Sequence, residues 1–193
     1  GDGSKFRDGW NYVVKIHMNK HDLVLLKFIE DLVFRIFAKK ISYFPEIKTN
    51  RGAVVLYSKF IYNFFDDYLT YERNKTLTVR LINRVIKYDK EFLRGFLLGL
   101  TLSDGYIKNK FIFVSISKQL AKNVFSILRL FGFEPGVYLQ DRSKYLTHGK
   151  YKEHNQFRIV LGREQTRQFK IFLQDVISDY GFNATLDQLK RYE

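Results

Sequence analysis

The chain has 193 residues, of which 46% are hydrophobic, and it carries 33 lysines and arginines against 20 aspartates and glutamates, for a net charge of +13 at pH 7. A chain this long and apolar buries a core, which excludes a disordered tail, and the absence of cysteine excludes disulfides and thiolate-bound metals. The positive charge indicates a polyanionic partner, most often nucleic acid, and no apolar run is long enough to span a bilayer, so we expect no membrane partner.

The first part of the chain predicts strands and helices in alternation. Residues 11–20 alternate apolar and polar side chains, which is typical of a half-buried strand. Residues 22–37 repeat apolar side chains at intervals of three and four, which predicts a helix with one buried face. Two further strands are expected at 41–48 and 53–58, followed by a short helix at 59–69.

The second part predicts the same order of elements. A connector at 71–90 contains a helical stretch at about 78–88 and leads into an apolar helix that ends at Ser103. The expected elements that follow are a strand at 110–118, a helix at 120–131, strands at 136–141 and 156–162, and a helix at 164–177.

The chain therefore reads as an internal repeat. Placing Lys20 on Lys118 superimposes the apolar positions of the two halves, and Asp104-Gly105 then has a counterpart in Asp2-Gly3. The sequence as given begins just after the place where the first copy's glycine-containing helix is expected. We predict an α+β fold, with one repeat at 1–70, the connector at 71–90, and a second repeat at 91–193.

Residues 97–105 read LLGLTLSDG, preceded by FLRG at 92–95. This stretch resembles the signature of the LAGLIDADG homing endonucleases, and the resemblance covers nearly the whole chain as two pseudo-symmetric αββαββα repeats that lack only the first helix. Leu102 stands where the signature has its first Asp, a position that varies in the family and is not the metal ligand. The resemblance implies a monomeric, site-specific DNA endonuclease with antiparallel, saddle-shaped sheets for DNA.

The chemistry of the motif is consistent with this resemblance. Gly95 and Gly99 would let the motif helix pack closely against a twin helix, although each glycine costs roughly 0.5–1 kcal/mol of helix stability relative to alanine. The twin helices would bring Asp2 and Asp104 together, and two adjacent carboxylates repel unless divalent cations lie between them. We expect Mg²⁺, with Mn²⁺ or Ca²⁺ able to substitute in binding, and hydrolysis of phosphodiesters.

The resemblance assigns further residues to the active site. Lys20 and Lys118 would place positive charge near the scissile phosphates or the attacking water, and Asn19 and Ser117 would order solvent. The main-chain carbonyls of Gly1 and Ser103 are expected to act as metal ligands beside Asp2 and Asp104.

Outward positions on the expected strands and loops are predicted to contact the major groove of DNA. In the first repeat they are Lys5, Arg7, Trp10, Lys15, His17, Lys48, Asn50 and Arg51. In the second they are Ser115, Tyr138, Gln140, Arg142, Lys144, Gln156 and Arg158. Because the two sets differ at almost every position, we expect a long, asymmetric target cut on both strands.

Two alternatives remain open. The same basic surface suits an RNA-binding intron maturase of the same family, with intron RNA as partner, or a catalytically silent DNA-binding regulator. The expected setting is intracellular, in the cytoplasm of an archaeon or bacterium or in a mitochondrion or chloroplast, with an intron-encoded or intein origin.

Overall fold

A computed structural model describes residues 3–72, 75–140 and 155–189. The chain divides into two compact units, which are Gly1–Asp67 with Gln174–Glu193, and Tyr68–Leu173. In the part of the chain that the structure describes, no helix is both long and apolar enough to cross a membrane.

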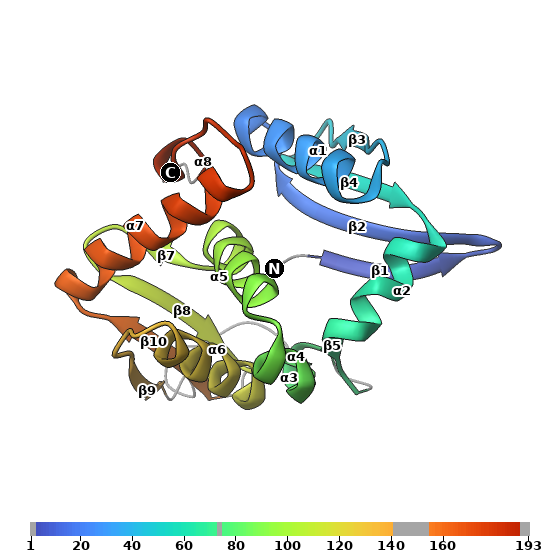
Figure 1. The fold of residues 1–193 in the computed structure, drawn as a ribbon. Helices are drawn as coiled ribbons and strands as arrows, with labels where there is room; N and C mark the ends of the chain where they lie inside the picture. Colours follow the sequence, from blue (N-terminus) through green and yellow to red (C-terminus); the bar gives the residue numbers. More distant parts are fainter. Residues whose placement is uncertain (1–2, 73–74, 141–154, 190–193) are drawn as a thin grey trace. The chain divides into compact units, whose positions relative to one another are not determined.

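The first unit contains a four-stranded antiparallel sheet (Figure 1). Its strands run in the order β1-β2-β4-β3 and are β1 (Gly3–Asp8), β2 (Asn11–Asn19), β3 (Ser42–Pro45) and β4 (Arg51–Tyr57). The helices α1 (Leu23–Phe37) and α2 (Lys59–Tyr68) cover one face of the sheet.

A small apolar core joins the helices of the first unit to the sheet. Val14 of β2 and Leu56 of β4 pack with Val33 of α1 and Ile61 of α2, and all four side chains are buried. Since neighbouring residues on a strand point to opposite faces, this core identifies the helix-covered face and, by alternation, the open face. On the open face, a smaller cluster is formed by Val13, Ala53 and Val55.

The second unit contains a sheet of the same order. Its strands run β7-β8-β10-β9 and are β7 (Tyr106–Ile107), β8 (Phe111–Ser115), β9 (Gly136–Gln140) and β10 (Gln156–Leu161). The helices along this part of the chain are α5 (Lys90–Ser103), α6 (Lys118–Leu130) and α7 (Arg163–Asp179). The rings of Phe111 of β8 and Phe169 of α7 pack edge to face, with centroids 4.8 Å apart, and both rings are buried.

The predicted α+β repeat is confirmed by the equivalent strand orders of the two sheets. The periodic helices begin and end within a few residues of their expected bounds. The connector differs from the expectation, because it contains a two-stranded sheet, β5 (Leu69–Thr70) with β6 (Arg80–Leu81), together with α3 (Lys75–Thr78) and α4 (Asn83–Tyr88).

The boundaries of the units also differ from the expected 1–70, 71–90 and 91–193. The connector groups with the second unit, whereas the C-terminal residues, including α8 (Leu186–Leu189), group with the first. The reason lies in specific contacts with α1. Phe182 packs on Phe28 with ring centroids 4.5 Å apart, Arg35 lies over the Phe182 ring, and its guanidinium donates a 2.6 Å hydrogen bond to the carbonyl of Tyr180.

Candidate carboxylate site and nucleic-acid surfaces

Asp104 lies at the end of the apolar helix α5. The helix begins at the Asp89 cap, whose carboxylate accepts a 2.8 Å hydrogen bond from the N–H of Phe92. It ends at Asp104, whose N–H donates to the carbonyl of Leu100 at 3.0 Å, and Asp104 is exposed. The C-terminal end of a helix concentrates partial negative charge. An acid at this end adds to that charge, which makes the position suitable for a cation.

Gly105 fixes the direction in which the chain leaves α5. A Cβ at this position would lie 2.8 Å from the Cα of Thr101 and 3.1 Å from the ring of Phe111. Only glycine therefore lets β7 start directly against the last turn of the helix. The Asp-Gly ending places the carboxylate at the junction of helix and sheet.

The donor set around Asp104 fits a hard divalent cation. Ser103 is the last residue of α5, and the last carbonyl groups of a helix have no intrahelical donors. Carboxylate and carbonyl oxygens are the ligands that Mg²⁺ and Ca²⁺ prefer. Among the described residues, no group of three or more His, Cys, Asp or Glu side chains forms a metal cluster. The expected ligands Gly1 and Asp2 lie outside the described residues.

The glycines of the motif helix were predicted to form a helix interface. A Cβ at Gly99 would meet nothing within 4 Å, so the helix surface at this position is open rather than packed. Gly95 lies on the same helix and is half-buried. Their role in a helix interface stays a prediction.

The two lysines that the repeat alignment paired occupy different positions relative to their helices. Lys20 lies two residues before the helix cap Asp22, whereas Lys118 directly follows the cap Ser117. The ammonium group of Lys20 donates to the carbonyl of Glu46 at 3.2 Å, and Lys118 is exposed. The side-chain oxygen of Asn19 accepts the N–H of His21 at 3.0 Å and so shapes the turn before the helix.

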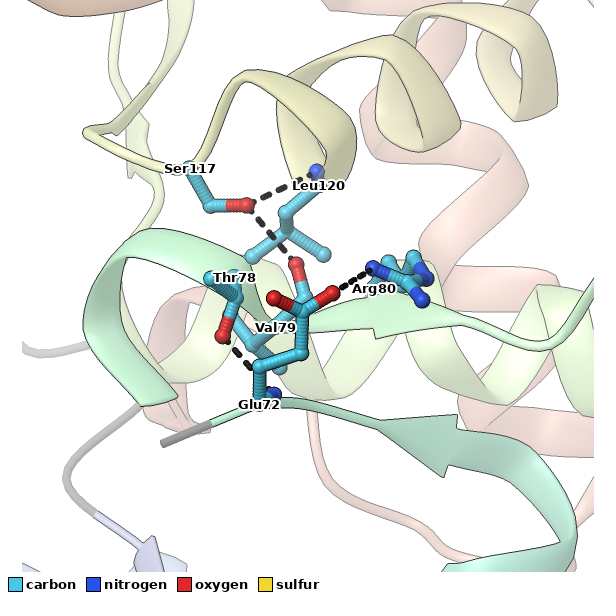
Figure 2. Close-up of polar contacts among 6 residues, drawn as sticks. All are labelled: Glu72, Thr78, Val79, Arg80, Ser117 and Leu120. Atoms are coloured by element: carbon cyan, nitrogen blue, oxygen red, sulfur yellow. Dashed lines mark hydrogen bonds and ion pairs between the residues drawn. The ribbon is translucent and has the colours of Figure 1, made fainter. Parts of the chain in front are cut away.

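Ser117 is held in the interior of the second unit (Figure 2). Its hydroxyl oxygen accepts the N–H of Leu120 at 3.2 Å, and the hydroxyl donates to the carbonyl of Val79 at 2.8 Å. The side chain is 0% exposed, so the hydroxyl is closed to solvent. These contacts give Ser117 the role of capping α6 and anchoring the connector.

The same close-up shows how the connector is folded onto itself beside this cap (Figure 2). The hydroxyl of Thr78 accepts the N–H of Glu72 at 2.9 Å, and the Glu72 carboxylate pairs with Arg80 at 3.4 Å. Leu81 donates its N–H to the buried Asn123 of α6 at 3.0 Å. The connector is thus a structured part of the second unit.

The open face of the first sheet carries polar and cationic side chains. Lys15 pairs with Val55 and His17 with Ala53, and these partners belong to the open-face cluster. Arg51 pairs with Asn19 at the end of the same face and is exposed. Lys15 and His17 are half-buried, whereas Lys48 and Asn50 in the loop before β4 are exposed, and the contact of all five residues with DNA stays a prediction.

Two further residues that the sequence predicts to point outward, Lys5 and the exposed Arg7, do not share a face with Lys15 and His17. Lys5 is paired with the core residue Val14, and Arg7 with Tyr12, so both lie on the helix-covered face. Lys5 forms an ion pair with Asp66 of α2, and its ammonium group lies 4.5 Å from the ring centroid of Tyr62. The Lys5 side chain therefore has a partner within the protein that lies far away in the sequence.

The open face of the second sheet includes four residues that the sequence analysis selected as outward positions. Gln156 pairs with Gln140, and Arg158 pairs with Tyr138, so these four side chains share one face. It is the open face, because Ile159 and Leu161, which point to the other face of β10, are buried. Arg142 and Lys144 lie outside the described residues.

The side chain of Ser115 lies on the opposite face of the second sheet from the one that the sequence predicts. It alternates with Val114, which is 37% exposed, and shares its face with Phe113, which is 1% exposed. Its hydroxyl accepts the N–H of Ser117 at 3.1 Å, which supports the turn into α6. The open face of the second sheet also includes Ile112, Val114 and Tyr106, which the sequence analysis did not select. The open face of the first sheet likewise includes Phe6, Phe44 and Tyr57.

No family model matches the chain, and no curated protein matches it by sequence. Solved structures of the homing endonuclease I-DmoI do match it, over 90% of this chain. Its mesophilic variants give a TM-score of 0.62 at 16% identity over 87% of their chain. I-DmoI in complex with DNA and Mn gives a TM-score of 0.62 at 15% sequence identity, over 88% of its chain. I-DmoI in complex with DNA and Ca gives a TM-score of 0.63 at 16% identity, over 82% of its chain.

The chain shares the fold of I-DmoI. I-DmoI is a LAGLIDADG homing endonuclease of two repeats. At this identity the likeness is one of fold, and it agrees with the equivalent order of the two sheets.

Proposed function

We propose that the chain is a LAGLIDADG-type homing endonuclease that cuts both strands of a long, asymmetric DNA target. The observation that carries the proposal is the repetition of the sheet, with an exposed acid, Asp104, at the junction where the motif helix enters the second sheet. The excess of positive charge supports a polyanionic partner.

The two open sheet faces would read the target. Tyr138, Gln140, Gln156 and Arg158 present donors and acceptors on one open face, and Lys15, His17 and Arg51 do so on the other. Such side chains distinguish base pairs by their edges in the major groove. Because the two sets differ in chemistry, the two half-sites are expected to differ in sequence.

The acids would carry the hydrolysis. In the proposed site Asp104 and Asp2, with the carbonyls of Ser103 and Gly1, would hold divalent cations. Such cations would polarise the phosphate and favour loss of a proton from the attacking water. Lys118, exposed at the start of α6, and Lys20 supply positive charge close to the phosphates. Ser117 is left out of this set, because its hydroxyl is used in the protein interior.

Cleavage of a randomised duplex library in the presence of Mg²⁺, followed by sequencing of the ends, tests the proposal. We expect one recurrent cut site, and we expect Asp104→Asn to bind that site without cutting it. Asp175→Asn, which changes an exposed acid on α7, is the matched control and should cut normally. Cutting by Asp104→Asn at the normal rate contradicts the proposal, and site-specific binding without cutting by the unaltered chain indicates a regulator.

A further inference from the structure

The far end of the first sheet carries an exposed tryptophan that the fold does not use. Strands β1 and β2 are joined by the two residues Gly9 and Trp10, with Asp8 paired to Asn11 beside them. Gly9 has a φ of 58° and supplies the left-handed conformation that a tight hairpin turn needs. The turn therefore depends on the glycine, whereas its other position accepts almost any side chain.

That other position holds the largest side chain available. Trp10 is 93% exposed, and it is the one tryptophan in the chain. An indole gains stability from burial and from stacking, and at this tip it obtains neither from the described residues. A surface of this kind is suited to a flat partner that the indole can cover.

Aromatic side chains continue from the tip onto the open face of the sheet. Phe6 and Tyr57 pair with Val13 from its two sides, so the three residues form one row across β1, β2 and β4. Phe6 is 43% and Tyr57 57% exposed. On the open face, this aromatic row is separated from the turn by the exposed pair Asp8 and Asn11.

Positive charge lies on the opposite face of the same hairpin. The guanidinium of Arg7 lies 4.8 Å from the ring centroid of Tyr12, and the ammonium group of Lys59 lies 5.6 Å from the same ring. These cations do not lie beside the aromatic row, but the net charge of +13 favours a negatively charged partner, and a partner that is negatively charged and also presents flat rings is a nucleic acid. Regular duplexes bury the faces of their bases, so the aromatic surface fits bases that have left the stack.

We propose that Trp10, with Phe6 and Tyr57, is a stacking platform for unpaired bases of DNA, formed where the duplex opens next to the proposed target. This inference rests on the proposed function and adds a second mode of binding to it. The open sheet face contacts paired bases of the target. The platform binds unpaired, unstacked bases at the end of that DNA segment. Aromatic stacking of this kind tolerates any base, because every base has a π face.

The single tryptophan provides a direct test. The full chain is titrated with a mixed-sequence duplex, with the same duplex containing a short run of mismatches, and with vesicles of anionic lipid, while the tryptophan emission is recorded. We expect the mismatched duplex to quench the emission and to bind more tightly than the paired duplex. Equal affinity for the two duplexes, or quenching by the vesicles rather than by DNA, overturns the inference.

Variants separate stacking from general binding. Trp10→Ala should lose about tenfold in affinity for the mismatched duplex and little for the paired duplex, whereas Trp10→Phe should retain most of the preference. Ile171→Ser, which removes a side chain that is 60% exposed on α7, is the control and should bind both duplexes normally. If the unaltered chain cleaves its target but shows no preference for the mismatched duplex, or if Trp10→Ala keeps that preference, the platform alone is refuted. Absent cleavage with the preference intact refutes the proposed function alone.

Discussion

Replacing Ser117 by alanine distinguishes a structural from a catalytic serine. The change removes one oxygen atom and leaves the volume of the site almost unchanged. It deletes the cap of α6, which costs about 0.5–2 kcal/mol of unfolding free energy, and it leaves the carbonyl of Val79 without its 2.8 Å donor, which costs about 1 kcal/mol more. We therefore expect a loss of about 1.5–3 kcal/mol in stability.

Urea unfolding followed by circular dichroism measures this loss. Asp22→Ala is the matched variant in the first unit, because the Asp22 carboxylate caps α1 through the N–H of Leu25 at 3.1 Å. It should cost about 1 kcal/mol. Ser178→Ala, which removes an exposed hydroxyl on α7, should cost almost nothing.

The cleavage rate of Ser117→Ala, measured at a temperature where the variant remains folded, decides the role of the residue. We expect a rate close to that of the unaltered chain, because the hydroxyl contacts no solvent. A variant of normal stability that has lost cleavage would refute this reasoning and would restore the serine to the active site.

Three further changes test other parts of the structure. Gly105→Ala should destabilise the chain by about 1–3 kcal/mol and reduce cleavage, since the new Cβ would lie 2.8 Å from the Cα of Thr101; unchanged melting and cutting would contradict this. Arg158→Ala should weaken binding of the selected target by about 1–3 kcal/mol, whereas Ser115→Ala should not, and equal effects in binding titrations would contradict the assignment of faces. Phe182→Ala should lower the melting temperature through the loss of its contact with α1, at a cost of about 2 kcal/mol, and a normal melting curve would exclude that contact.

The elements with strong periodicity were predictable from the sequence. The helix at 23–37 and the helix at 118–130 each repeat apolar side chains along one face, and their positions in the sequence are near those in the structure. The equivalent order of the two sheets follows from the same pattern, because each copy repeats strand, helix and strand pair.

The face to which a strand side chain points was harder to predict where a polar side chain has a partner within the protein. Ser115 and Ser117 look like surface residues, but their hydroxyls are used in the turn and cap at the start of α6. Lys5 looks like a cation for DNA, but it pairs with Asp66, far away in the sequence. Hydropathy alone cannot identify a polar group whose partner lies within the protein.

The positions of the proposed site residues in the fold were predictable only in part. Asp104 follows a helix whose end is clear from the sequence, and the structure places it at the expected junction. The equivalence of Lys20 and Lys118 was less secure, because the two copies differ in the number of residues between strand and helix cap. A short insertion of this kind is invisible to an alignment without gaps.

The grouping of residues 174–193 with the first unit has a consequence for the order in which the protein is completed during synthesis. The N-terminal sheet is synthesised first, but Phe182 and Tyr180, which contact α1, are translated only after the residues of the second unit. The first unit can therefore be completed only after the second unit has been synthesised. Chimeric proteins that exchange repeats should accordingly transfer the C-terminal residues together with the N-terminal unit.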